Sequence, residues 1–89
     1  MSREIKWSKQ AYQELLSWSK SNKKTVQKIT ELIKDIDENH PKPGLGKPEQ
    51  LKGMNDIWSR RINEKDRLVY KVLTDEILIY QCKGHYQDT

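Results

Sequence analysis

The stretch from residue 57 to residue 82 reads IWSRRINEKDRLVYKVLTDEILIYQC and contains three short apolar runs. The runs span residues 57–62, 67–73 and 77–82, with polar links at 63–66 and 74–76. Runs rich in Ile, Val, Trp and Tyr that are joined by three or four turn residues are typical of antiparallel strands. This stretch therefore predicts an antiparallel meander.

The residues before the meander predict two amphipathic helices and a short leading strand. A helix from about residue 8 to residue 20 begins at Ser8, a good N-cap residue, and repeats apolar side chains at three- and four-residue steps. A second helix over residues 23–38 carries an apolar stripe made of Val26, Ile29, Ile33 and Ile36. Ile5 and Trp7 indicate the leading strand. We therefore expect one α+β domain over residues 1–89, with a helical hairpin on a three- to four-stranded antiparallel sheet.

The segment between the second helix and the meander is an unusually long loop. Residues 39–56 hold all three prolines and three of the four glycines, and they show no apolar periodicity. Structureless loops longer than about 12–15 residues are uncommon in compact domains, and they tend to be functional or disordered. The loop is therefore a candidate for part of a functional site, with disorder as the alternative.

The charge of the chain favours an acidic partner. The 89 residues carry a net charge of +4, and residues 42–67 hold seven basic side chains against four acidic ones. A basic surface of this kind attracts nucleic acid or an acidic protein, although it also occurs on proteins without such a partner. The basic segment overlaps the long loop and the first two predicted strands.

Composition also argues against several classes of protein. Cys82 is the single cysteine, so it has no intrachain disulfide partner, and no Cys and His cluster has zinc-site spacing. We expect Cys82 to be a core residue in a reducing compartment. No apolar stretch approaches the roughly 18 residues of a membrane span. These features predict a cytoplasmic protein with no metal, no cofactor and no membrane association.

The strand pattern predicts a polar face on the sheet. In the middle strand Leu68, Tyr70 and Val72 share one face, and Arg67, Val69 and Lys71 share the other. If the last strand continues regularly, Ile79, Gln81, Lys83 and His85 also share a face. One sheet face is then partly lined with Arg67, Lys71, Gln81, Lys83 and His85. This face is a candidate for binding an anion, the alternative being that its charges are merely solvated.

Four short motifs follow one another in the chain. They are Gly46-Lys47-Pro48-Glu49-Gln50-Leu51-Lys52, Trp58-Ser59-Arg60-Arg61-Ile62, Arg67-Leu68-Val69-Tyr70 and His85-Tyr86. In this order they resemble the YoeB/Txe family of the RelE toxin superfamily, over nearly the whole chain. The resemblance implies the toxin of a type II toxin–antitoxin pair, an endoribonuclease that cleaves messenger RNA in the ribosomal A site. It also implies three kinds of partner: the 70S ribosome with its messenger, an acidic antitoxin and a second copy in a homodimer.

The resemblance assigns the active site to Glu49, Arg67, His85 and Tyr86. Cutting RNA through its own 2′-hydroxyl needs a base, a cation on the phosphate and an acid for the departing oxygen, and it needs no metal. Glu49 fits the base and Arg67 the phosphate clamp, while His85 fits the acid because free histidine has a pKa near ~6.5. Tyr86 either stacks on a base, orients the phosphate or anchors the last strand.

Lys47, Lys52 and Arg61 are expected to hold the RNA backbone around this site. Arg60 and Arg61 point to opposite faces of a regular strand, and strand parity selects Arg61 for the site. Glutamate is intrinsically a weak base at neutral pH, so burial of Glu49 or the ribosome has to assist it. Gln50, Gly84 and the terminal Gln87-Asp88-Thr89 depart from the family pattern, which puts in doubt the loop geometry and any role of a terminal carboxylate.

Three other functions remain open on sequence grounds. The domain could occupy RNA or a ribosomal site and block it without cutting. It could be a ParE-like inhibitor of DNA gyrase, although the set of Glu49, Arg67 and His85 argues against that. It could also be an interaction protein whose task is to pair with another small chain.

Overall fold

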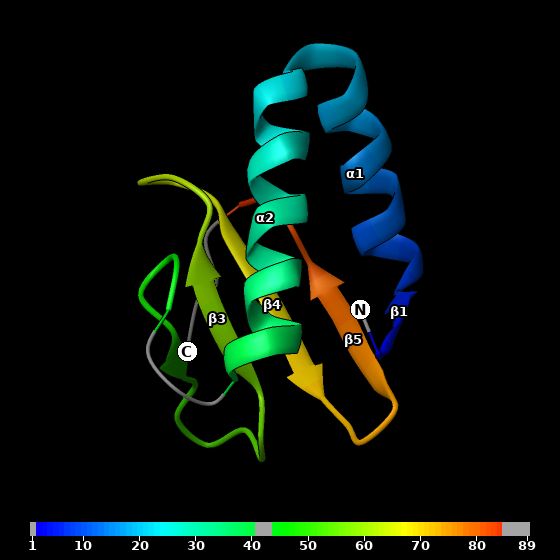
Figure 1. Cartoon of the computed structure of the whole chain (residues 1–89). Helices are drawn as coiled ribbons and strands as arrows, with labels where there is room; N and C mark the ends of the chain where they lie inside the picture. The colour runs from blue at the N-terminus through cyan, green and yellow to red at the C-terminus, as the bar shows by residue number, and fades with distance from the viewer. Residues whose placement is uncertain (1, 41–43, 85–89) are drawn as a thin grey trace.

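The computed structural model describes residues 2–40 and 44–84, and it consists of two helices packed on a mixed sheet (Figure 1). The elements follow in the order β1 (Glu4–Trp7), α1 (Lys9–Ser21), α2 (Lys23–Asn39), β2 (Glu49–Gln50), β3 (Trp58–Arg61), β4 (Arg67–Val72) and β5 (Glu76–Gln81). The predicted α+β class and the helical hairpin are confirmed. His85 and Tyr86 lie outside the described residues.

The sheet has five strands in the order β1-β5-β4-β3-β2. The meander predicted from the sequence is present as β3, β4 and β5, which pair antiparallel in succession. The sheet differs in two respects from the three to four antiparallel strands that the sequence predicted. The long loop contributes the two-residue strand β2, and β1 pairs with β5 in parallel. Strand direction depends on where the intervening chain returns, which apolar periodicity does not encode.

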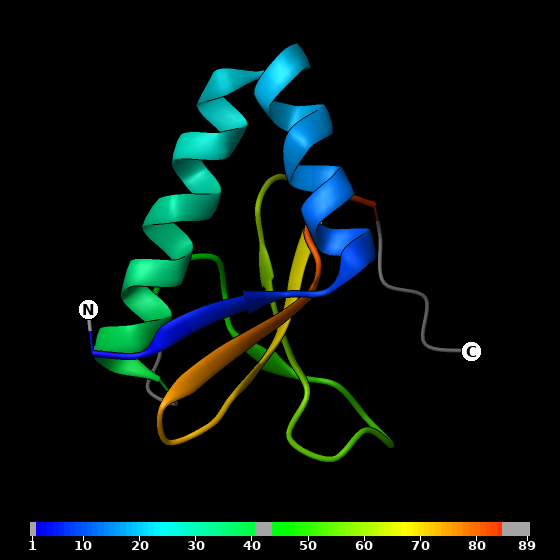
Figure 2. The same ribbon diagram turned by 90° about the vertical axis from the view of Figure 1, so that its right-hand side faces the viewer.

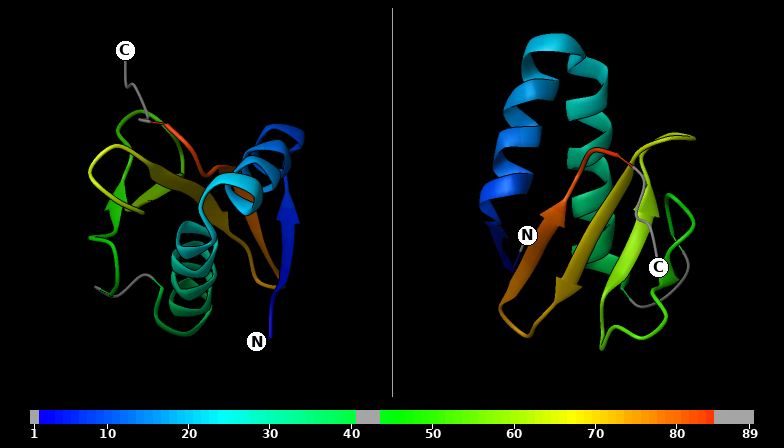
Figure 3. Two further views of the ribbon diagram at one scale, coloured as in Figure 1. Left: turned by 90° about the horizontal axis from the view of Figure 1, so that it is seen from above. Right: turned by 180° about the vertical axis from the view of Figure 1, so that it is seen from behind.

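Capping residues explain where the two helices begin. The Ser8 hydroxyl accepts a hydrogen bond from the backbone N–H of Ala11 at 3.0 Å. The Asn22 side chain does the same for Thr25 at 3.3 Å, so one residue ends α1 and starts α2. Both helices lie on one side of the sheet (Figure 2). No helix of the described residues covers the opposite side, which we call the open face (Figure 3).

The core lies between α2 and the sheet. The stripe of α2 buries Ile29, Ile33 and Ile36 as expected, while Val26 is only half-buried. Cys82 is fully buried, which confirms it as a core residue, and its sulfur contacts the Ala11 carbonyl oxygen at 3.5 Å. Burial, with smaller contributions from Glu14 and Asp66, raises the pKa of the Cys82 thiol to about 12. None of the helices in residues 2–40 and 44–84 is long and apolar enough to span a membrane.

Candidate active site on the open face of the sheet

Strand register brings three of the proposed site residues onto the open face. Glu49 pairs with Ser59 across β2 and β3, and Arg61 pairs with Arg67 across β3 and β4. Ser59 and Arg61 are two residues apart, and paired residues share a face, so all four lie on the same side. From ordinary strand spacing, the Cα atoms of Glu49 and Arg67 are about 12 Å apart. Long side chains on these two positions can reach toward one phosphodiester group between them.

The prediction that Arg61, rather than Arg60, faces outward is confirmed. Arg61 is exposed, whereas Arg60 pairs with Leu68 and is completely buried on the helix side of the sheet. Arg60 is therefore not available to RNA. Lys47, Glu49 and Lys52 are exposed, as residues that contact a large ligand need to be.

The turn before β4 fixes the position of Arg67. Asn63 Oδ1 accepts hydrogen bonds from the backbone N–H groups of Lys65 and Asp66, both at 2.8 Å. Arg67 Nη1 donates to the carbonyl oxygens of Asn63, Glu64 and Asp66 at 2.9, 3.2 and 3.3 Å. Within the described part of the chain, Nε and Nη2 of Arg67 have no hydrogen-bond partner. The guanidinium group is thus anchored at one nitrogen and retains donors for an anion.

The end of the described chain is tied to the same turn. The backbone N–H of Arg67 donates to the Gly84 carbonyl oxygen at 3.0 Å, and the Gly84 N–H donates to Asp66 Oδ1 at 2.7 Å. Gly84 therefore sits against Arg67, immediately before His85 in the sequence. The roles expected of His85 and Tyr86 stay predictions.

An irregularity in β5 corrects the expected lining of the open face. Val69 pairs with Gln81 while the next residue, Tyr70, pairs with Ile79, so Tyr80 is an extra residue in a β-bulge. Ile79 consequently points into the core and Gln81 points to the open face. The prediction that Ile79 and Gln81 share one face was therefore wrong. The prediction that Lys83 lines the open face was also wrong, because Lys83 Nζ donates to Ser17 Oγ on α1 at 3.0 Å. Lys71 lies on the open face as predicted.

A buried ion pair secures the loop that carries Glu49. Arg60 donates from Nη1 to the Asp35 carboxylate and, at 3.0 Å, to the Leu45 carbonyl oxygen. Its Nε donates to the Tyr70 hydroxyl at 3.1 Å. Asp35 also accepts the Leu45 N–H at 3.1 Å. The start of the loop is therefore bonded at Leu45 to α2 and to the sheet core.

The carboxyl of Asp35 is held in its ionised form by these contacts. Burial alone would raise the pKa of Asp35. Hydrogen bonds from Arg60, Asn39 and the Leu45 N–H, together with the charge of Arg60, outweigh burial and hold that pKa below its usual range. Burial raises the pKa of the Tyr70 hydroxyl, which therefore remains protonated at neutral pH.

Gly46 lets the loop pass close to β3. Its carbonyl oxygen accepts the Arg61 N–H at 2.6 Å, and its φ of +78° lies in the left-handed region. A Cβ at this position would lie 2.8 Å from the Arg61 carbonyl oxygen and 2.9 Å from Leu32 Cδ2. A glycine is thus required both by the backbone angle and by the close approach. The loop then leads directly to Lys47 and Glu49.

His40 is a half-buried group that sequence reasoning missed. Its ring lies edge-on to Trp58, with ring centroids 4.9 Å apart, and it also faces Tyr70. Among the described residues its Nδ1 atom is buried without a hydrogen-bond partner. Burial, followed by the positive charges of Arg60 and Arg3, lowers the pKa of His40. The only sequence signal was its position at the end of the second helix.

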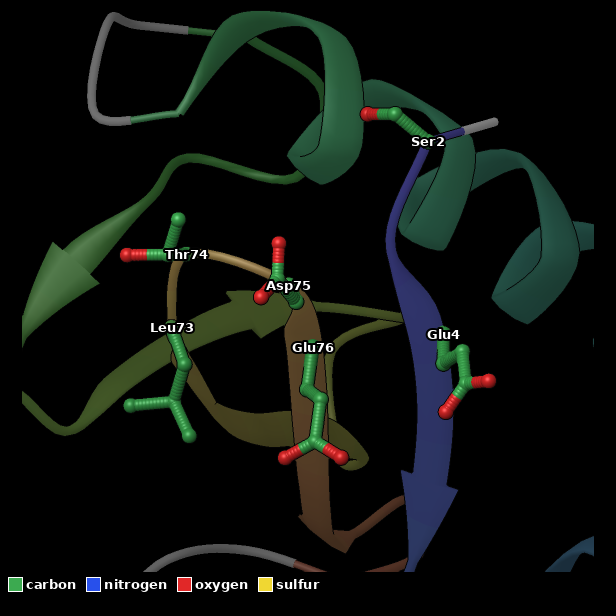
Figure 4. A pocket seen from close by; sticks show the side chains of 6 residues that line it. All are labelled: Ser2, Glu4, Leu73, Thr74, Asp75 and Glu76. Atoms are coloured by element: carbon green, nitrogen blue, oxygen red, sulfur yellow. The ribbon is translucent and has the colours of Figure 1, made fainter.

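A hollow near the turn that joins β4 and β5 is negatively charged, unlike the positively charged region around Arg67. Its volume is about 690 Å³, and its lining contains the carboxylates of Glu4, Asp75 and Glu76 (Figure 4). These groups repel RNA phosphates, so the hollow does not compete with the Arg67 region for such a ligand. No group of three or more His, Cys, Asp or Glu side chains in the described ranges is arranged to hold a metal ion.

Comparison with protein families matches residues 7–86 to the YoeB-like toxin of bacterial type II toxin-antitoxin systems. The chain belongs to this family. Toxin YoeB of Escherichia coli strain K12 is 47% identical over 81 residues, covering 90% of this chain and 95% of that protein. Toxin RelK of Mycobacterium tuberculosis strain H37Rv is 38% identical over 85 residues, covering 94% and 99%. The resemblance found in the sequence is confirmed.

Two solved structures agree with this YoeB-family assignment. The YoeB dimer from Staphylococcus aureus superimposes with a TM-score of 0.92 at 44% identity, covering 97% of this chain and all of that one. A heterotetrameric YoeB-YefM toxin–antitoxin complex from the same species matches with a TM-score of 0.88 at 44% identity, with the same coverage. The chain is therefore a YoeB-family toxin of a type II toxin–antitoxin system.

Proposed function

We propose that this YoeB-family toxin is an endoribonuclease that enters the ribosomal A site and cleaves messenger RNA there. The observation that supports the proposal best is the register across β2, β3 and β4. It puts a carboxylate, Glu49, and two guanidinium groups, Arg61 and Arg67, on the sheet face that no helix of the described residues covers. A base and a phosphate clamp are two of the three groups that cleavage through the 2′-hydroxyl requires.

The proposed reaction assigns one role to each group. Glu49 removes the proton of the 2′-hydroxyl, whose oxygen attacks the adjacent phosphorus. Arg67 stabilises the extra negative charge that develops on the phosphate oxygens, through the donors that the turn carbonyls do not use. His85 protonates the departing 5′-oxygen, so the first products are a 2′,3′-cyclic phosphate and a 5′-hydroxyl. Tyr86 orients the phosphate, and Lys47, Lys52 and Arg61 bind the flanking backbone.

The exposure of Glu49 gives the ribosome a part in this chemistry. Glu49 lies on a two-residue edge strand and is exposed, so water reaches its carboxylate in the free toxin. Docking in the A site would remove water from both Glu49 and the messenger, which strengthens their electrostatic interactions. We therefore infer that cleavage depends on the ribosome.

We also infer the protein partners from charge and from the relatives. The family structures from Staphylococcus aureus are described as a dimer and as a heterotetramer with the antitoxin YefM. The net charge of +4 on this chain suits an acidic antitoxin. We infer a cognate antitoxin, a homodimer of this chain and a cytoplasmic location.

Primer extension on a defined messenger tests the proposed activity. Purified toxin and the variant His85→Ala are added to a bacterial translation reaction, with and without ribosomes. We expect breaks within codons that require ribosomes and disappear in the variant. Intact messenger with arrested translation would refute the nuclease and favour a module that blocks the A site without cutting.

A further inference from the structure

We propose that a hollow beside the candidate active site binds one unpaired nucleobase of the RNA substrate. The hollow measures about 280 Å³, and it is lined by Gln10, Met54, Ile57, Val69, Tyr80 and Gln81. The inference rests on the proposed function, because it gives the ribonuclease a site for reading a base. It adds side chains from α1 and β5 to a site so far built from β2, β3 and β4.

The register places this hollow next to the residues that would hold the phosphate. Glu49, Ser59, Val69 and Gln81 form one row across four strands, because each pairs with the next. Arg67 precedes Val69 by two residues on the same face of β4, which separates their Cα atoms by roughly 7 Å. A nucleotide whose phosphate contacts Arg67 can therefore place its base over Val69.

The walls of the hollow suit a flat aromatic ligand. The bulge in β5 makes Tyr80 the unpaired residue, and its side chain remains 36% exposed. Bulges commonly redirect a side chain beside an active site. Ile57 supplies aliphatic surface next to the tyrosine, and Val69, which is only 4% exposed, lies beneath it in the lining of the hollow. Unpaired RNA bases are typically bound by stacking on such an aromatic ring.

Two amide side chains at the hollow offer hydrogen-bond acceptors. Gln10 Nε2 donates to Glu14 Oε2 at 3.0 Å, and Gln81 Nε2 donates to the Gly84 carbonyl oxygen at 3.2 Å. These bonds orient both amides, and among the described residues neither Oε1 atom has a partner. An amide oxygen accepts hydrogen bonds. Adenine, cytosine and guanine carry an exocyclic amino group whose two N–H bonds can serve both acceptors, whereas the pairing edge of uracil has a single N–H, so the hollow favours the first three bases over uracil.

A nucleotide matches both halves of this surface, the positive charges and the apolar walls. An apolar protein segment would fill the hollow but leave the Arg61 and Arg67 charges beside it unmatched. A free phosphate would match the charges but leave the apolar walls exposed. A nucleotide carries an anionic group and a flat base within the spacing that the strands provide.

Binding of 2′-O-methylated trinucleotides tests the proposal without cleavage, because methylation removes the attacking hydroxyl. Wild-type toxin is titrated with one such trinucleotide and with versions that lack the base at each position in turn. We expect loss of one base to weaken binding about tenfold, the range found for stacking on an aromatic side chain. Replacement of that base by uracil should weaken it by a smaller factor.

Substitutions at Tyr80 locate the base. Tyr80→Ala should bind the intact and abasic trinucleotides equally, whereas Tyr80→Phe should keep the difference because it keeps the ring. Tyr12→Ala is the matched control, since Tyr12 is another exposed tyrosine, 52% exposed, on α1. Gln10→Ala should reduce the discrimination against uracil while leaving the preference for a base over an abasic site.

Three results would overturn the proposal. The first is equal binding of intact and abasic trinucleotides by the wild type. The second is that Tyr80→Ala does not change the difference in affinity between intact and abasic trinucleotides. The third is that Tyr80→Ala loses the dimer on gel filtration while its preference for the intact trinucleotide is unchanged. The last result would assign the hollow to an interface between copies. Primer extension on ribosomes reports the nuclease separately. Cleavage without base-dependent binding refutes the hollow alone, and base-dependent binding without cleavage refutes the nuclease alone.

Discussion

Removal of the Asp35 carboxylate tests whether the buried ion pair holds the active-site loop. Asp35→Ala leaves Arg60, which is 0% exposed, without its anionic partner, and it also removes the acceptor of the Leu45 N–H. Breaking a fully buried pair in this way costs about 3–5 kcal/mol. The Asp35 side chain is 15% exposed, so we expect the lower end, about 3 kcal/mol. For a domain of this size that corresponds to a fall in Tm of roughly 12–24 °C.

A double variant separates stability from loop positioning. Asp35→Ala with Arg60→Met removes both charges and keeps an apolar side chain of similar length in the core, so most of the lost stability should return. It still lacks the bonds to Leu45, and the loop that carries Glu49 is no longer held. We therefore expect a folded protein whose cleavage rate is at least tenfold lower than that of the wild type.

Urea unfolding and primer extension on ribosomes measure the two effects. Lys6→Ala is the control, because Lys6 forms only exposed ion pairs with Glu4 and Glu76 and should cost under about 1 kcal/mol. A loss below 1 kcal/mol in Asp35→Ala would refute the assigned role of the pair in stability. A stable and fully active double variant would refute its role in positioning the loop.

Four further predictions concern single groups. Gly46→Ala should lower the free energy of unfolding, measured in urea, by about 2–4 kcal/mol because of strain at φ +78° and the contact with Arg61. The control Gly53→Ala, at φ +73° with open space around it, should lower it by only about 1–2 kcal/mol. The lowered pKa of His40 means that the unfolded chain binds a proton more readily, so the free energy of unfolding should fall as the pH drops below about 6.5, and His40→Gln should flatten this slope. With its pKa at about 12, Cys82 should resist iodoacetamide at pH 8 in the folded protein and react in urea; rapid labelling of the native state would contradict its burial. Arg67→Lys should slow cleavage at least about tenfold in single-turnover assays, because lysine lacks the planar fork that binds two phosphate oxygens. An unchanged rate would contradict the role of Arg67 as the phosphate clamp.

The parts of the fold that apolar periodicity encodes were predictable from the sequence. Helix bounds differ from the prediction by at most one residue, because Ser8 and Asn22 are strong capping residues. Strand parity placed Arg61 on the open face, since β3 is regular between its two neighbours. These features depend on local chemistry that the sequence states directly.

The features that escaped prediction depend on contacts between distant residues. The bulge at Tyr80 reversed the alternation of β5, and a continuous apolar run gives no sign of such an insertion. The ion pair of Arg60 escaped prediction because its partner, Asp35, is 25 residues away in the chain. The hollow at Tyr80 combines α1, the loop before β3 and two strands, so no single motif contained it.

The most direct test of the proposed nuclease is the single-turnover rate of messenger cleavage on programmed ribosomes by Glu49→Gln. Glu31→Gln on α2 is the matched control, because Glu31 is also an exposed carboxylate but lies on the helix side of the sheet. Loss of a general base should slow cleavage by about 100-fold or more, with the control equal to the wild type. Equal rates for Glu49→Gln and the wild type would contradict the assignment of Glu49 as the base on the open face.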